Sequence, residues 1–188
     1  MVKLVQKSYR LAFCSIISAL SGVTMILTGI IPIGTYALPA ISGALLLPII
    51  IEVGCKHAFY SYIVTSLLSI ILAADKEAVI LFILFLGYYP ILKFALSKLK
   101  FKFLRLIIKF LIFNTTTILS YLIAVNILLI PQDTIVIEGI PLPYLMLIFS
   151  NIVFLMYDYS IHVVTIMYVL KIRPKLIIPP NGPKLPHK

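Results

Sequence analysis

Long apolar runs fill most of the chain, and short polar or Pro- and Gly-containing segments separate them. A transmembrane helix needs about 20 mostly apolar residues to cross a hydrocarbon core of roughly 30 Å. Six runs are long enough, some of them with a tilt: Leu11–Ile30, Tyr36–Val53, His57–Ala74, Ala78–Leu96, Leu104–Ile130 and Tyr144–Leu170. The pattern therefore predicts an all-α, polytopic membrane protein with six transmembrane helices.

The composition agrees with this fold class and limits the number of domains. The chain has 188 residues, of which 62% are hydrophobic, and its mean hydropathy is +1.14. We expect one six-helix membrane domain over residues 1–172 and a Pro-rich, basic tail over residues 173–188. This length leaves no room for a soluble catalytic domain, so we predict that the protein is not an enzyme.

The basic residues lie almost entirely on one side of this arrangement. Fifteen of the sixteen Lys and Arg residues lie before span one, between spans two and three, around the junction of spans four and five, or after span six, and all of these segments are on one side of the membrane. Lys76 alone lies in a loop on the other side. Because positively charged segments resist translocation, both termini are expected in the cytoplasm, in a multi-pass protein of the plasma membrane. The net charge of +10 then reflects orientation in the lipid bilayer, and we expect no nucleic-acid partner.

Two segments are candidates for docking a partner. Small residues on span one recur at helical spacing and share one face, which lets another helix approach closely. They are Ala12, Ser15, Ala19 and Gly22. This face fits a partner subunit and internal packing equally well. After span four, Lys98, Lys102, Arg105 and Lys109 lie on one face of an amphipathic helix. That face predicts anchoring to lipid phosphates, with docking of a cytoplasmic partner as the alternative.

Polar residues in the outer loops are candidates for binding a small solute. The turn between spans three and four holds Asp75, Lys76 and Glu77, and the outer ends of spans two and six hold Tyr36 and Tyr144. A solvated turn is the ordinary explanation of the three charges, since acids also suit the start of the following helix, and a ligand role is the alternative. The later outer segment, residues 131–143, is apolar enough to form a short hairpin lid.

Span six carries the most informative polar residues. Asp158 and His162 are four residues apart, so they can share a helical face and a hydrogen bond. An ionisable group at this depth costs several kcal/mol unless it is paired, which makes Asp158 a functional candidate by default. We predict a buried polar network made up of Asp158, His162, Lys93, Asn114, Asn151 and Tyr88. It fits a structural tie between spans six and four, or a proton relay. A kink is expected nearby at Pro90.

Catalytic, metal and nucleotide motifs find little support. The sequence has neither an HExxH motif nor a serine nucleophile elbow, so it does not support hydrolysis. Cys55 and His57 supply too few ligands for a metal. We therefore expect no cofactor and no metal. The sequence has no Gly-x-x-x-x-Gly-Lys loop, so any ATP hydrolysis must come from partner proteins.

Six spans, cytoplasmic termini, the small residues of span one and the outer loop after it resemble the S components of energy-coupling factor (ECF) transporters. In that family an Ala-x-x-x-Ala motif on the first helix docks the transmembrane coupling subunit. Ala12, Ser15 and Ala19 match it as small residues, and Ile16 stands where the strict motif has alanine. The resemblance implies an S-component-like bundle, a coupling subunit and ATPases as partners, and an unknown solute, vitamin-like or other, bound near the outer face.

Residues 75–77, 85–90 and 151–158 also resemble a family of small bacterial membrane proteins that are grouped loosely with S components. Asp158, His162 and Lys93 lie toward the cytoplasmic half, so in such a protein they suit folding or partner coupling better than contact with an outer solute. Two other functions fit the sequence. One is a non-transporting scaffold of envelope assembly, of the rod-shape-determining type. The other is a stand-alone transporter that moves protons through Asp158 and His162.

Overall fold

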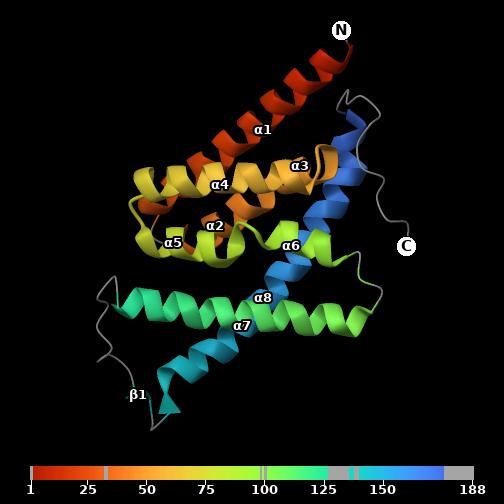
Figure 1. Ribbon diagram of the computed structural model, residues 1–188. Helices are drawn as coiled ribbons and strands as arrows, with labels where there is room; N and C mark the ends of the chain where they lie inside the picture. The colour runs from red at the N-terminus through yellow and green to blue at the C-terminus, as the bar shows by residue number, and fades with distance from the viewer. Residues whose placement is uncertain are drawn as a thin grey trace. The chain divides into compact units, whose positions relative to one another are not determined.

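The computed structural model describes residues 2–31, 34–97, 99, 101–126, 136–137 and 140–175, and nearly all of them are helical (Figure 1). Within these residues, six stretches are long and apolar enough to cross a membrane: Ser8–Gly29, Gly34–Glu52, Cys55–Leu72, Lys76–Leu96, Lys102–Ser120 and Leu147–Lys175. Many large apolar side chains on these helices face outward, including Leu11, Ile71 and Phe103, which are 71%, 76% and 76% exposed. Exposed apolar surface of this extent is covered by lipid. The prediction of a multi-pass, six-span protein is confirmed.

The chain forms two compact units, and helix α8 (Leu142–Met167) contributes to both. The first unit is Met1–Lys98 with Ile161–Lys188, and the second is Leu99–Ser160. The first unit contains α1 (Val2–Ile26), the 3-10 turn η1 (Leu27–Gly29), α2 (Gly34–Leu45), α3 (Leu47–Glu52), α4 (Cys55–Leu72), α5 (Lys76–Leu81), the π-helical turn η2 (Phe82–Leu86) and α6 (Tyr89–Leu96).

Helix α1 packs against α2 and α4 and is tied to α2 by a pair of buried serines. The Oγ atoms of Ser21 and Ser42 lie 2.6 Å apart, and each lies 2.9–3.1 Å from the other residue's carbonyl oxygen. Small hydroxyl side chains allow this close approach and satisfy each other inside the bundle. At one end of the unit, Gly29 approaches Ala74 so closely that a Cβ at Gly29 would lie 2.8 Å from the Ala74 Cβ.

The second predicted span is broken, but not where its first proline lies. Pro39 sits inside α2, and Leu46 forms the turn between α2 and α3, where its N–H donates to Gly43 O at 3.1 Å. Pro48 follows in the first turn of α3, where a proline needs no hydrogen-bond donor. The second span is therefore interrupted at Leu46, between Gly43 and Pro48.

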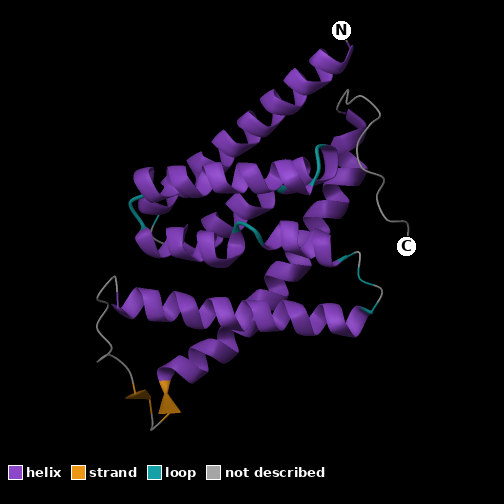
Figure 2. Ribbon diagram, viewed as in Figure 1, coloured by secondary structure: helices purple, strands orange, loops and turns teal. Residues whose placement is uncertain are grey.

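The fourth predicted span is also interrupted, between η2 and α6 (Figure 2). The N–H of Gly87 donates to Phe82 O at 2.8 Å, five residues back, and Pro90 begins the next helix. Tyr62 Oη donates to Ile83 O at 2.7 Å within the π-turn. The irregularity predicted at Pro90 thus begins earlier, at a π-turn that brings Gly87 against the Tyr62 ring.

The second unit is a pair of helices, α7 (Lys102–Asn126) and the first part of α8. Between them, β1 (Val136–Ile137) pairs antiparallel with β2 (Ile140–Pro141), in the register Val136↔Pro141 and Ile137↔Ile140. The predicted short hairpin is confirmed in these residues, and its role as a lid stays a prediction.

After α8 the helix continues through a π-turn, η3 (Tyr168–Ile172), and a 3-10 turn, η4 (Arg173–Lys175). The first three residues of the predicted tail, Arg173–Lys175, form this 3-10 turn, and the tail itself stays a prediction. Residues 176–188 lie outside the described part of the chain. Arg173 Nε lies 3.1 Å from Glu52 Oε1, which joins this helix end to the end of α3. We call the end of the first unit that carries Arg10, Lys56 and Arg173 the basic end.

Candidate functional site

The charged turn between α4 and α5 forms local contacts. Asp75 Oδ1 accepts a hydrogen bond from Ala78 N at 3.1 Å, so Asp75 is the N-cap of α5. Lys76 Nζ donates to Ile70 O and Ala73 O at 2.9 and 3.0 Å, which caps the last turn of α4. Both side chains thus stabilise the ends of helices, and a role in binding a solute stays a prediction.

Glu77 joins this turn to α2. Tyr36 Oη donates to Glu77 Oε1 at 2.9 Å, and the Tyr36 side chain is otherwise largely exposed. The structure therefore brings together four of the five residues predicted to bind a solute, at the end of the first unit opposite the basic end. Tyr144 lies in the first turn of α8, and its side chain is outside the described residues.

Within the second unit, an amide pair links α7 to α8. Asn114 Nδ2 donates to Asn151 Oδ1 at 3.2 Å, and Asn151 Nδ2 donates to Asn114 Oδ1 at 3.0 Å. The second N–H of each amide reaches a carbonyl one turn earlier in its own helix, at 2.9 and 2.7 Å. Two of the predicted network residues thus form a closed pair that satisfies its own amide groups.

A buried ion pair lies nearby in the same unit. Lys109 Nζ donates to Asp158 Oδ1 at 2.8 Å, and the two side chains are 9% and 25% exposed. Between the ion pair and the amide pair, the Phe154 ring stacks on Phe113 at 4.6 Å and meets Phe110 edge-on at 5.3 Å. Since aromatic rings exclude water, they strengthen the electrostatic contact beside them.

Lys109 is therefore a partner of Asp158 that sequence reasoning missed. We expected Asp158 to pair with His162 or Lys93, which stays a prediction, and we had grouped Lys109 with the surface-anchoring cations. Lys109 lies about two helical turns after Lys102, the first residue of α7, and this depth separates it from the other basic residues. The interaction ties span six to span five.

The remaining predicted network residues belong to the first unit. His162 is exposed on α8, and Lys93 lies half-buried in the last turn of α6. Tyr88 packs edge-on against Tyr62 and Phe85, with ring centroids 6.1 and 6.3 Å away. Tyr88 thus takes part in an aromatic cluster.

The small-residue face of α1 is divided between the bundle and its surroundings. Gly22 is buried, whereas Ala12, Ser15 and Ala19 are exposed. Neighbouring Ser18 and Ser21 are buried. Internal packing therefore accounts for the Ser18 side of the helix, and three of the four predicted docking residues remain accessible.

The basic face predicted on the fifth span is partly described. Lys102 is exposed at the start of α7, Arg105 is half-buried one turn later, and Lys98 lies outside the described residues. Phe101 and Phe103 are 73% and 76% exposed beside them. Cations interleaved with aromatic rings are typical of a helix end at a membrane interface.

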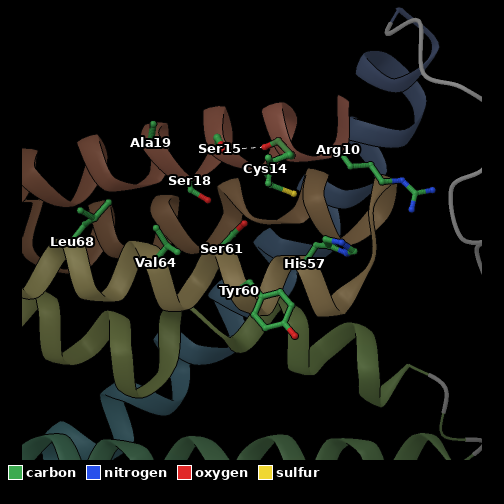
Figure 3. Close-up of a pocket in the computed structure, with 11 residues that line it drawn as sticks. Arg10, Cys14, Ser15, Ser18, Ala19, His57, Tyr60, Ser61, Val64 and Leu68 are labelled. Carbon is green, nitrogen blue, oxygen red and sulfur yellow. Dashed lines mark hydrogen bonds between the residues drawn. The ribbon is translucent and has the colours of Figure 1, made fainter. Parts of the chain in front are cut away.

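The side of α1 next to α4 borders a groove with a volume of about 580 Å³ (Figure 3). The groove is lined by Arg10, Leu11, Cys14, Ser15, Ser18, Ala19, His57, Tyr60, Ser61, Val64 and Leu68. Arg10 and His57 lie toward one end, and Ala19 and Leu68 lie toward the other. The groove is therefore polar and cationic at the basic end and becomes apolar away from it.

No sequence motif identified this groove, because its residues come from two stretches of the chain, 10–19 and 57–68, that lie 38 or more positions apart. The one available signal was the small-residue face of α1, which marks a place where side chains do not fill the space between helices. In the described part of the chain, no group of three or more His, Cys, Asp or Glu residues is arranged to hold a metal ion.

Comparisons with protein-family models, with curated proteins and with solved structures find no match for this chain. The six membrane-spanning helices, the buried contacts between α7 and α8, and the groove beside α1 are therefore the observations on which function must be argued.

Proposed function

We propose that this protein is the solute-binding membrane subunit of an ECF-type importer, and that it docks its coupling subunit through α1. The basic end faces the cytoplasm in this proposal, with both termini on that side, and the membrane is the plasma membrane. The observation that carries the proposal is the accessibility of Ala12, Ser15 and Ala19 on a helix whose other side is packed into the bundle.

The packing of α1 explains why this face suits a partner. Ser21 and Met25 are fully buried against the bundle, so α1 is held by one side, and its other side is left to lipid or to another protein. Helices in lipid gain no hydrophobic energy from association, so close backbone approach at small residues is what favours a specific contact. Ala12 and Ala19 offer such an approach, flanked by exposed Ile16 and Val23.

The solute would bind at the opposite end of the first unit, near Tyr36 and Glu77. Tyr36 Oη already donates to Glu77 Oε1 at 2.9 Å, and a solute with its own hydrogen-bonding groups would exchange for this exposed contact at small cost. Energy for uptake would come from ATPases bound to the coupling subunit, since the chain has no phosphate-binding loop.

Co-purification tests the docking face directly. The tagged protein is co-expressed with a coupling subunit and two ATPases and isolated in mild detergent. We expect the wild type to retain these partners, and the variants Ala12→Leu and Ala19→Leu to lose them because the larger side chains separate the helices. The matched control is Ala37→Leu, an exposed alanine on α2. Wild-type protein that stays alone, or equal retention by Ala19→Leu and wild type, would refute the proposal.

A further inference from the structure

We propose that the groove between α1 and α4 binds an anionic phospholipid of the cytoplasmic leaflet, with its phosphate at Arg10 and His57 and an acyl chain along Val64 and Leu68. This inference concerns the protein on its own. It depends on the orientation of the basic end and does not depend on a coupling subunit or a transported solute.

The length of the groove matches one leaflet. Its lining extends over α1 from Arg10 to Ala19 and over α4 from His57 to Leu68. At 1.5 Å per residue, these stretches are about 14 and 16 Å long. One leaflet of the hydrocarbon core is about 15 Å thick, half of the roughly 30 Å total. A chain that enters at the basic end would therefore reach the middle of the bilayer.

The order of side chains along the groove matches the order of groups in a phospholipid. Arg10 and His57 lie at the basic end, where a phosphate would sit. Ser15, Ser61 and Tyr60 offer hydroxyl groups in the region where glycerol and ester oxygens follow. Beyond them the lining is apolar, as an acyl chain requires.

The basic end attracts an anion for two separate reasons. Arg10 carries a guanidinium group, whose fork of N–H donors fits phosphate oxygens, and Lys56 adds a neighbouring positive charge. Helix α4 begins there, and the positive end of its dipole adds to the attraction for an anion. The nearest buried acid, Glu52, faces Arg173, with Arg173 Nε 3.1 Å from Glu52 Oε1.

The polarity gradient of the groove favours a lipid over a partner helix as the occupant. Arg10 and His57 lie at one end of the groove and apolar side chains at the other, which is the order of groups in a phospholipid, whereas a transmembrane helix is apolar along this whole length. A partner helix would contact α1 at Ala12, which does not line the groove, and at Ala19, which lines only its apolar end. An acyl chain is narrow enough to lie between α1 and α4.

Lipid retention on the purified full-length protein tests the headgroup site. Native mass spectrometry would measure binding of phosphatidylglycerol and phosphatidylcholine with matched acyl chains. We expect phosphatidylglycerol to bind at least about tenfold more tightly, and the variant Arg10→Gln or His57→Gln to reduce that preference, since a hydrogen bond to a charged group is worth about this much. Lys171→Gln, a basic residue of the same end that does not line the groove, is the control and should keep the preference.

A second pair of variants tests the path of the acyl chain. Val64→Trp fills the groove, whereas Ile70→Trp places the same side chain on an exposed part of α4 outside it. We expect loss of retained lipid in the first variant alone. Equal binding of the two lipids, competition by inorganic phosphate alone, or a photo-crosslinker at position 64 that captures a protein in place of lipid would each overturn the proposal.

Discussion

Removal of either partner of the Lys109–Asp158 pair should destabilise the protein far more than removal of both. The Nζ and Oδ1 atoms lie 2.8 Å apart, and the side chains are 9% and 25% exposed. At an effective dielectric constant of 20, their attraction is about 6 kcal/mol. Loss of hydration offsets much of this attraction, so the intact pair adds little net stability, whereas removing one partner of a buried pair costs about 3–5 kcal/mol.

We expect Lys109→Met and Asp158→Leu each to lower the free energy of unfolding by about 2–4 kcal/mol, at the lower end for Lys109→Met because the remaining Asp158 carboxylate is a quarter exposed. The double variant should lie within about 1 kcal/mol of the wild type, since apolar side chains of similar size replace a buried pair with little loss. Reversible unfolding by denaturing detergent in mixed micelles measures all four proteins.

The control is Lys102→Met, which removes an exposed cation from the same helix and should change stability by less than about 0.5 kcal/mol. Losses that simply add in the double variant would show that the two charges do not interact. A harmless Asp158→Leu substitution would show that Asp158 is not held in a buried pair. Either result would refute the reasoning and reopen a role for Asp158 in proton transfer.

Two further predictions concern close packing in the first unit. Gly87→Ala should destabilise the protein by about 1–3 kcal/mol, because the new Cβ would lie 2.8 Å from the Tyr62 ring. Gly22→Ala should be neutral or stabilising, because no neighbouring atom lies within 4 Å of the new Cβ, and thermal unfolding compares the two variants. Ser21→Ala and Ser42→Ala should each cost about 0.5–1.5 kcal/mol, and a double-mutant cycle should give a coupling of at least about 0.5 kcal/mol, since each removes the contact between the two hydroxyl oxygens and one hydroxyl-to-carbonyl hydrogen bond. Equal behaviour of the two glycine variants, or additive serine variants, would contradict this packing.

The sequence predicts the spans well because a bilayer demands about 20 apolar residues for each crossing, whatever the helices contact. It predicts helix breaks less well: Pro90 marks an irregular region, but the π-turn before Gly87 depends on packing against Tyr62, which lies on another helix. A proline in the sequence shows only that a backbone N–H is missing there, and it does not show which aromatic ring packs beside the break.

Side-chain partners were the least predictable feature. Periodicity placed Lys109 on a basic face, and only the antiparallel alignment of α7 and α8 shows that it reaches Asp158. The Asn114–Asn151 contact carries the same information, because it fixes how the two helices align. Lys109 and Asn114 on one helix and Asn151 and Asp158 on the next have similar spacing, and this pattern would have indicated both contacts together.

The account depends most on the chain crossing the membrane so that the basic end lies in the cytoplasm. Labelling of right-side-out vesicles with a membrane-impermeant maleimide tests this directly. Labelling of native Cys55 is measured in a Cys14→Ser variant. Labelling at position 76 is measured in a Lys76→Cys variant in which Cys14 and Cys55 are both replaced by serine. We predict that the cysteine at position 76 reacts in intact vesicles and that Cys55 reacts only after solubilisation. Reaction of Cys55 in intact vesicles, with position 76 protected, would contradict the orientation and every proposal that depends on it.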